Sequence, residues 1–122
     1  MSTAPAFKFP RGSETTDVTK PCLEWLQLHG IYAWRQNTGA VKFKGDSGKD
    51  RFVKFGKAGI SDILGILPGG RFLAIETKRA DGNVTVEQSE FLANIANRGG
   101  VALVARSVED MVTGLRLSGY AK

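Results

Sequence analysis

The sequence predicts an α/β fold, a central mixed β-sheet of about five strands flanked by helices. Short apolar runs bounded by glycine or proline predict strands, and longer runs with apolar residues on one face at helical spacing predict helices. The strongest strand signal is a pair of apolar runs, residues 60–67 and 72–77, separated by Pro68-Gly69-Gly70. We expect the strand over residues 72–77 to lie near the centre of the sheet.

The two runs around Pro68-Gly69-Gly70 predict a β-hairpin, because proline presets φ and glycine supplies the positive φ that a tight reversal needs. If Gly69 is the centre of a three-residue loop, the residue numbers of each cross-strand pair add up to 138. Asp62 then faces Glu76, with Cβ atoms about 5 Å apart. Lys78 then points to the same face as Glu76. A four-residue loop would instead slip the pairing by one residue and put Asp62 on the opposite face.

Two carboxylates that face each other in an apolar hairpin repel and destabilise the sheet. A divalent cation between Asp62 and Glu76 would remove that conflict, since Mg²⁺ is often bound by one or two carboxylates together with phosphate oxygens and waters. Such a metal polarises a phosphodiester and activates a water, while Lys78 positions or deprotonates that water. The alternative is a buried salt bridge between Lys78 and the two acids, without a catalytic role.

Length and composition indicate one small domain. Residues 1–13 carry two prolines and no periodic pattern, so we expect a flexible arm before a single domain over residues 14–122. No run approaches about 18 consecutive apolar residues, and the N-terminus lacks the apolar segment of a signal peptide. Cys22 is the single cysteine, which excludes an intrachain disulfide and suits a reducing cytosol. We therefore expect a cytoplasmic protein with Cys22 in its core.

Residues 14–29 predict a helix that ends at Gly30. Pro21 is compatible only with a first turn, so this helix begins near Lys20 or is kinked there. His29 lies at the end of the helix, where a cation interacts favourably with the helix dipole. The apolar face of the helix consists of Val18, Cys22, Trp25, Leu26 and His29.

The net charge of +5 is concentrated between Arg35 and Lys57, where seven basic residues stand against two acidic ones. Basic clusters attract phosphate backbones through counterion release, irrespective of base sequence, and the alternative is an ordinary solvated face. After a short strand over residues 31–35, alternating runs at 41–44 and 51–55 predict a second hairpin, with Val41 and Phe43 directed inward. The basic side chains expected to contact nucleic acid are Arg35, Lys42, Lys44, Lys54 and Lys57.

The last third of the chain predicts a helix over residues 86–97, a strand over 101–105 and a helix from Ser107 to about Leu117. Thr85-x-x-Gln88 fits a capping box, which is a structural role for Gln88. Gln88 also shares a helix face with apolar residues, from which it would reach the lysine or the water of the site. We expect this second, functional role.

The motifs of the first hairpin resemble those of a known nuclease family. Gly59-Ile60-Ser61-Asp62, then thirteen residues, then Glu76-Thr77-Lys78, resembles the PD-(D/E)xK nuclease signature. The G-x-S-D form, the E-x-K and the downstream Gln88 resemble more narrowly a stand-alone VRR-NUC domain, a type found in phages and bacteria, over residues 14–115. This resemblance implies a restriction-endonuclease-like core and a site in which Asp62, Glu76, Lys78 and Gln88 are catalytic. It also implies Mg²⁺ or Mn²⁺ bound by Asp62, Glu76 and the backbone carbonyl of Thr77.

Two further residues follow from the resemblance. Family members carry an acidic residue early in the first helix that reaches the metal, and Glu14 is the best match, with Asp17 and Glu24 as competitors because the spacing departs by about one residue. The loop after Arg35 resembles an arginine–asparagine–glycine loop that lies near DNA in the family, so we expect Asn37 at the nucleic acid.

The function expected from these features is a metal-dependent DNA endonuclease that selects branched structures. Stand-alone relatives in the family that the chain resembles are similar to Holliday-junction resolvases, which act as homodimers with two sites on two strands. Two alternatives belong to other classes. The first is a nucleic-acid-binding protein with an inert, salt-bridged core, and the second is an interaction subunit whose basic face binds an acidic partner.

Overall fold

The structure is a computed structural model that describes residues 15–36, 39–44 and 50–120, with side chains over residues 17–36 and 56–120. The arm predicted for residues 1–13 lies outside the described residues. Along the part of the chain that is described, none of the helices is long and apolar enough to cross a membrane.

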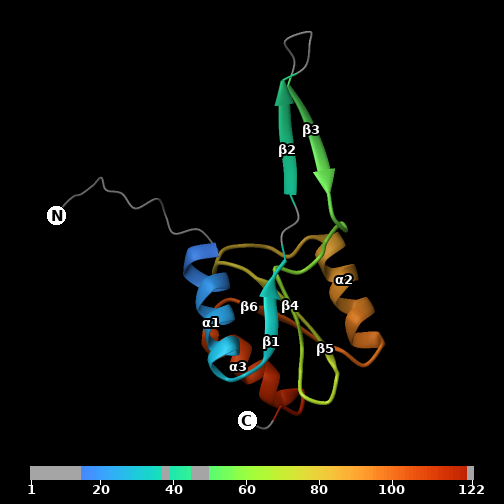
Figure 1. Cartoon of the computed structure of the whole chain (residues 1–122). Helices are drawn as coiled ribbons and strands as arrows, with labels where there is room; N and C mark the ends of the chain where they lie inside the picture. The colour runs from blue at the N-terminus through green and yellow to red at the C-terminus, as the bar shows by residue number, and fades with distance from the viewer. Residues whose placement is uncertain (1–14, 37–38, 45–49, 121–122) are drawn as a thin grey trace, which may run out of the picture.

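The main sheet has four strands in the order β1-β4-β5-β6 (Figure 1). β4 is antiparallel to both β1 and β5, whereas β5 and β6 are parallel, so the sheet is mixed as predicted. β5 lies between β4 and β6, which confirms the interior place expected for the strand over residues 72–77. The strand bounds are β1 Tyr32–Arg35, β4 Ile63–Ile66, β5 Phe72–Thr77 and β6 Val101–Ala105.

The second hairpin, β2 Gly39–Lys44 and β3 Asp50–Phe55, is antiparallel as predicted but does not join the main sheet. It forms a two-stranded sheet of its own, which projects from one end of the main sheet (Figure 1). The expected count of about five strands in one sheet was therefore wrong for the described residues. The reason is that β1 pairs directly with β4, from Arg35 opposite Ile63 onward, so the chain between them has no place in the sheet.

The turn of the first hairpin sets the register that places the motif residues. Gly70 N–H donates to the carbonyl of Leu67 at 2.9 Å, and Gly69 has a φ of 92°, a positive value that glycine adopts without steric cost. The observed pairs run from Ile63 opposite Ile75 to Ile66 opposite Phe72, so the residue numbers of each pair add up to 138. The predicted register is confirmed.

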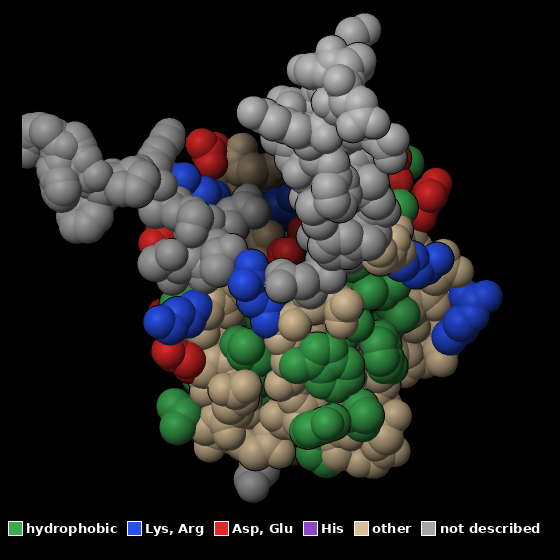
Figure 2. All heavy atoms as spheres, turned by 45° about the horizontal axis from the view of Figure 1, so that its top comes forward, with side chains coloured by type: hydrophobic (Ala, Val, Ile, Leu, Met, Phe, Trp, Pro, Cys, Tyr) green, Lys and Arg blue, Asp and Glu red, His purple; other side chains and the backbone are tan. Residues whose placement is uncertain are grey.

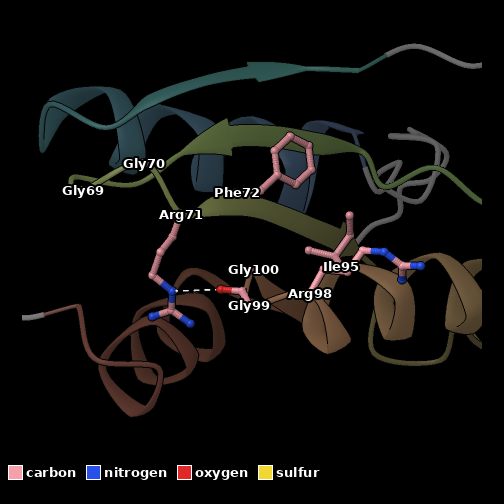
Figure 3. Close-up of a pocket in the computed structure, with 8 residues that line it drawn as sticks. All are labelled: Gly69, Gly70, Arg71, Phe72, Ile95, Arg98, Gly99 and Gly100. Atoms are coloured by element: carbon pink, nitrogen blue, oxygen red, sulfur yellow. Dashed lines mark hydrogen bonds between the residues drawn. The ribbon is translucent and has the colours of Figure 1, made fainter.

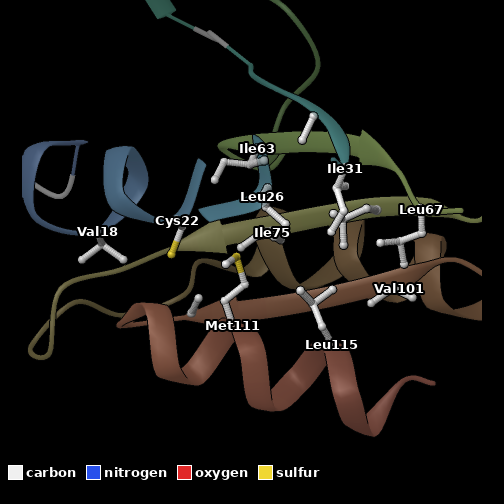
Figure 4. Packing of buried hydrophobic residues seen from close by; sticks show 13 residues of the cluster. Val18, Cys22, Leu26, Ile31, Ile63, Leu67, Ile75, Val101, Met111 and Leu115 are labelled. Atoms are coloured by element: carbon white, nitrogen blue, oxygen red, sulfur yellow. The ribbon is translucent and has the colours of Figure 1, made fainter. Parts of the chain in front are cut away.

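The sheet lies between two layers of helices. Helices α1 Lys20–Leu28 and α3 Val108–Leu117 cover one face, and α2 Val86–Asn97 packs over β5 and β6 on the other. Cys22 and Leu26 of α1 meet Met111 and Leu115 of α3 over Ile75 in the larger core cluster (Figure 4). The predicted core position of Cys22 is confirmed.

The first helix begins where Pro21 requires. A short π-helix, Thr15–Thr19, leads directly into α1, in which Pro21 lies in the first turn. Proline has no N–H to donate to the residue four positions earlier, so the turn before it widens into a π-type turn. Of the predicted apolar face, Val18, Cys22 and Leu26 are buried, while His29 is exposed and stacks on Trp25.

Candidate active site at the open end of the first hairpin

The predicted site residues lie at the end of the main sheet from which the second hairpin projects. β4 begins at this end, after Asp62, and β5 reaches it at Thr77, so the G-x-S-D and E-x-K motifs meet there. β1 also ends here, and the N–H of Gln36 donates to the carbonyl of Asp62 at 2.7 Å. Three chain segments therefore position the two motifs relative to each other.

Asp62 lies one residue before the paired part of β4, and its carboxylate turns to the backbone of β5. Oδ2 accepts two hydrogen bonds from Thr77, one from its N–H and one from its hydroxyl, each 2.9 Å long. The register that was expected to bring Asp62 and Glu76 together is correct, but the bonded partner of the Asp62 carboxylate is Thr77. Asp62 is half-buried, so solvent reaches part of the residue.

Glu76 and Lys78 form an ion pair at the end of β5. Lys78 Nζ lies 3.7 Å from Glu76 Oε2, and the two residues are only 8% and 2% exposed. Charges with so little solvent around them interact more strongly than charges on a surface, and separating them leaves a costly buried charge. The alternation along β5 that was predicted to put both side chains on one face is consistent with this contact.

The backbone carbonyl of Thr77 lies on the side of β5 that faces Asp62. Lys78 N–H donates to the carbonyl of Ala105 on β6 at 3.0 Å, whereas Thr77 N–H faces Asp62 on the side of β4. A residue in an extended strand directs its N–H and C=O to the same side, so the Thr77 carbonyl also faces the side of Asp62.

These donors suit a hard divalent cation. Asp62, Glu76 and the Thr77 carbonyl supply oxygen ligands, and Mg²⁺ usually takes one or two carboxylates and keeps several waters. Among the described residues, no group of three or more His, Cys, Asp or Glu side chains comes together. Asp17 and Glu24 are both exposed and do not complete such a group, and Glu14 lies outside the described residues.

Gln88 lies at the start of α2 and forms the predicted capping box. Its side-chain oxygen accepts from Thr85 N–H at 2.9 Å, and its own N–H donates to Thr85 Oγ1 at 3.1 Å. The amide NH₂ group takes no part in these two bonds, so it is the group through which a functional role would act. Gln88 is half-buried.

Gly59, the first residue of the G-x-S-D motif, packs directly on the start of α2. It has a φ of +75°, and a Cβ atom built on it would lie 2.2 Å from the carbonyl oxygen of Glu87 and 2.8 Å from the nitrogen of Gln88. Only glycine allows both this backbone conformation and this close approach. The motif glycine thus brings the loop before Asp62 against the helix that carries Gln88.

The basic residues predicted to contact nucleic acid are only partly described. Arg35, at the end of β1, and Lys57, before Gly59, are both exposed at the end of the sheet that carries the motifs. Lysine and arginine side chains are spread around this end of the molecule (Figure 2). Lys42 and Lys44 on β2 and Lys54 on β3 have side chains outside the described part, and Asn37 lies outside it altogether.

Two buried hydroxyl groups lie beside the site in surroundings that the sequence pattern does not predict, and one of them belongs to the serine of the G-x-S-D motif. Thr19, at the start of α1, is buried and its hydroxyl is hydrogen bonded to the hydroxyl of Thr77, 58 residues away in the chain. Ser61, beside Asp62, is buried, and its hydroxyl has no hydrogen-bond partner among the described residues. Neither a helical period nor a strand period identifies such a contact, because it depends on how distant segments pack.

A groove of about 460 Å³ lies at the other end of β5, beside the hairpin turn (Figure 3). Arg71 closes part of it, because its Nε donates to Gly99 O at 3.1 Å and its terminal nitrogen to Ser118 O at 2.7 Å. Phe72, Ile95 and Arg98 also line the groove. None of the predicted site residues belongs to it.

Comparison with known proteins supports the resemblance seen in the motifs. The family model for the VRR-NUC domain matches residues 13–109, which include both motifs, Gln88 and the strands and helices up to the start of α3. No curated protein and no solved structure matches the chain. The matched region covers most of the 122 residues, and the chain therefore belongs to the VRR-NUC domain family, a family of nucleases.

Proposed function

We propose that the protein is a metal-dependent endonuclease that cuts branched DNA as a homodimer. The observation that carries this proposal is the convergence of Asp62, Glu76, Thr77 and Lys78 at one end of the β4–β5 hairpin. Family membership supports nuclease chemistry, and the oxygen donors of the site support a divalent cation, Mg²⁺ or Mn²⁺.

The residues of the site have complementary roles in phosphodiester hydrolysis. Asp62, Glu76 and the Thr77 carbonyl would hold the cation, which supplies Lewis acidity and lowers the pKa of a bound water. Lys78 Nζ, as the ammonium of the ion pair with Glu76, orients the attacking water, and its positive charge stabilises the negative charge that grows on the phosphate oxygens. The water oxygen bonds to phosphorus, one P–O ester bond breaks, and a proton passes to the oxygen that leaves. The buried ion pair with Glu76 holds the Lys78 ammonium in place for these tasks.

Charge and exposure support the proposed substrate and the proposed dimer. The excess of positive charge from Arg35 to Lys57 precedes the site directly, which favours a phosphate backbone as the partner. A chain of 13.2 kDa offers little surface for reading bases, and a dimer would present two sites to the two strands of a junction. A cross-strand row of exposed apolar side chains, Tyr32, Ile66 and Phe72, supports a contact with a second copy.

A cleavage assay tests the proposal. Labelled four-way junction and matched linear duplex are incubated with the protein in Mg²⁺, in Mn²⁺ and in EDTA. Asp62→Asn and Lys78→Met should each lower the cleavage rate by at least about 100-fold, since each removes a group that acts in the transition state. Glu90→Gln, on α2, and Arg98→Ala, beside the groove at the other end of β5, change exposed residues of the same charge and serve as controls with wild-type rates.

The outcomes separate the parts of the proposal. Cleavage in either metal that is absent in EDTA and lost in both folded site variants would support the metal site, and faster cutting of the junction would support structure selection. Equal cutting of junction and duplex would refute the selection of branched DNA and leave the metal-dependent cleavage standing. Cleavage that survives Asp62→Asn would refute the assignment of the site.

A nucleic-acid-binding protein without catalysis is the second candidate, and the Glu76–Lys78 ion pair favours it, because such a pair also has a purely structural use. In that case the protein binds DNA with a steep salt dependence and cuts in none of the metal conditions. Lys78→Met would then lower the melting temperature and leave DNA affinity unchanged.

A further inference from the structure

We propose that two threonine hydroxyls, those of Thr19 and Thr77, form a hydrogen-bond chain that orients the Asp62 carboxylate and thereby strengthens its binding of the divalent cation. The proposal rests on the metal-dependent function proposed above and assigns positioning roles to Thr19 and to the side chain of Thr77. The Thr77 side chain is the middle residue of the E-x-K motif, a position that the motif leaves open.

The direction of the chain follows from counting hydrogens. A threonine hydroxyl has one hydrogen to donate, and that of Thr77 is directed to Asp62 Oδ2 at 2.9 Å. The oxygen of Thr77 must therefore be the acceptor in its contact with Thr19, which is 2.5 Å long. The hydrogen bonds thus run from Thr19 to Thr77 and from Thr77 to the carboxylate, and each bond in such a series polarises the next.

Both hydroxyls are buried, and among the described residues that of Thr19 contacts only Thr77. Thr77 is fully buried and Thr19 is 3% exposed, so neither exchanges its bond for one to bulk water. Thr19 occupies the N-cap position of α1, but its backbone is helical and its side chain makes no capping bond. Its hydroxyl instead reaches across to β5, where the polar group is satisfied inside an otherwise apolar layer.

The hydrogen bonds from Thr77 give the two carboxylate oxygens of Asp62 different surroundings. Oδ2 accepts both the N–H and the hydroxyl of Thr77, which fixes the plane of the carboxylate. Within the described residues no hydrogen bond reaches Oδ1, so this oxygen is the one available to a cation. Partners that orient a ligand in this way typically change metal affinity by about 10-fold or more when they are removed.

Valine substitutions remove the hydroxyls and keep the branched shape. Thr77→Val retains the N–H bond to Asp62 and should weaken Mn²⁺ binding about 10-fold. Thr19→Val leaves Thr77 in place and should weaken binding by about two- to threefold, because it removes only the polarising bond. Thr77→Ser, which restores a hydroxyl, should recover most of the affinity. In the Thr77→Val background, Thr19→Val should have no further effect on affinity, because the chain is already broken.

The experiment is a titration of the full chain with Mn²⁺ in which the spectrum of free Mn²⁺ is followed by electron paramagnetic resonance. Thermal unfolding in EDTA is recorded for every variant, so that a change in metal affinity is separated from a change in stability. Thr113→Val, at an exposed threonine of α3, is the matched control and should bind Mn²⁺ like the wild type.

The results distinguish failure of this inference from failure of the function. If the wild type binds Mn²⁺ and Asp62→Asn does not, but Thr77→Val and Thr19→Val bind like the wild type, the hydroxyl chain has no role in metal binding. If the two valine substitutions weaken binding additively, they act separately and the chain is refuted. If Thr77→Val does not fold, Thr19→Val with the wild type and Thr113→Val still decides the question. A wild type that binds no Mn²⁺ would overturn the proposed metal site, and this inference with it.

Discussion

The two acidic residues of the site differ in their surroundings, and this difference suggests a division of work. Asp62 is half-buried and is held by two neutral donors of one residue, so its negative charge is oriented without being neutralised. Glu76 is almost completely buried beside the ammonium of Lys78. For the proposed cation, Asp62 would therefore be the more accessible ligand, whereas Glu76 lies beside the charge of Lys78.

Cys22 shows what burial does to a reactive group elsewhere in the core. Desolvation, together with the carboxylates of Asp110 and Glu109, raises the pKa of its thiol to about 11 from 9.0. Below pH 9 the thiol is protonated in both the folded and the unfolded chain. Between pH 9 and pH 11 only the unfolded chain ionises, so the free energy of unfolding falls as pH rises, by about 1 kcal/mol at pH 10.

This predicts a slow thiol and a specific pH dependence. At pH 8, reaction of the single cysteine with a disulfide reagent should be limited by opening of the fold and should become fast in urea. Cys22→Ala should be less stable because of the cavity, but it should lose about 1 kcal/mol less than the wild type between pH 8 and pH 10. Equal pH slopes for the two proteins in urea denaturation would contradict the raised pKa.

Among the elements, the contact between the loop before β4 and the start of α2 depends on one glycine. At Gly59 an alanine would be strained twice, by the positive φ and by the overlap with the backbone of Glu87. Gly30 has nearly the same φ, 74°, but nothing lies within 4 Å of its added Cβ atom. The two positions therefore separate backbone strain from steric overlap.

Gly30→Ala should lower the free energy of unfolding by about 1 kcal/mol, the usual cost of a left-handed alanine. Gly59→Ala should cost at least about 2 kcal/mol more, because the loop has to move away from α2. Urea denaturation of both variants measures this difference. Equal losses would mean that the loop moves freely and that α2 does not position Asp62.

The capping box at the start of α2 allows the two roles of Gln88 to be separated. Glutamate is the other residue that closes a capping box, so Gln88→Glu should retain the bond from Thr85 and a melting temperature within a few degrees of the wild type. It removes the amide NH₂ group, and with a functional role for that group the cleavage rate should fall by about 10-fold or more. Thr85→Ala is the complementary control, with a loss of about 1 kcal/mol in stability and little loss of cleavage. If Gln88→Glu cuts DNA like the wild type, the residue is a helix cap alone.

Features whose determinants lie close together in the chain could be predicted from the sequence. Pro68-Gly69-Gly70 determines the register of β4 and β5. The helices that follow Thr85 and Ser107 begin where predicted, and both residues accept a capping hydrogen bond. Contacts between distant segments could not be predicted. The bond of Thr19 to Thr77 depends on the packing of α1 on the sheet, and the separate β2–β3 sheet depends on the direct pairing of β1 with β4. The hairpin register and the resemblance both pointed to Asp62, Glu76 and Lys78, but no local pattern shows that Asp62 is bonded to Thr77.

For the whole molecule, the uneven cover of the sheet is the feature that bears on assembly. α2 packs over β5 and β6, which leaves the β1 side of the same face with exposed apolar side chains. Tyr32 is 72% exposed and lies beside Ile66 and the ring of Trp34, on a strand at the edge of the sheet. Hydrophobic side chains are gathered on this side of the molecule, below the end that carries the hairpin (Figure 2).

If this face is the contact between two copies, a charge on it should produce monomers. Tyr32→Asp and Ile66→Asp should each reduce the mass in solution from twice 13.2 kDa to that of one chain, with a nearly unchanged melting temperature because both residues are exposed. Leu28→Asp, which charges an equally large residue that is 84% exposed on α1, should leave the dimer intact. Sedimentation velocity measures these masses. Dimers that persist in both face variants would place the contact elsewhere.

The direct pairing of β1 with β4 has one more consequence, which concerns how such a nuclease is altered in evolution. Gln36 and Asp62 are hydrogen bonded to each other, so the whole excursion through β2 and β3 leaves and re-enters the domain at nearly the same point. A segment attached in this way adds little to the entropy of closing the fold when its length changes. The chain can thus exchange or lengthen the segment that contains β2 and β3, while the hairpin that carries Asp62, Glu76 and Lys78 keeps its register.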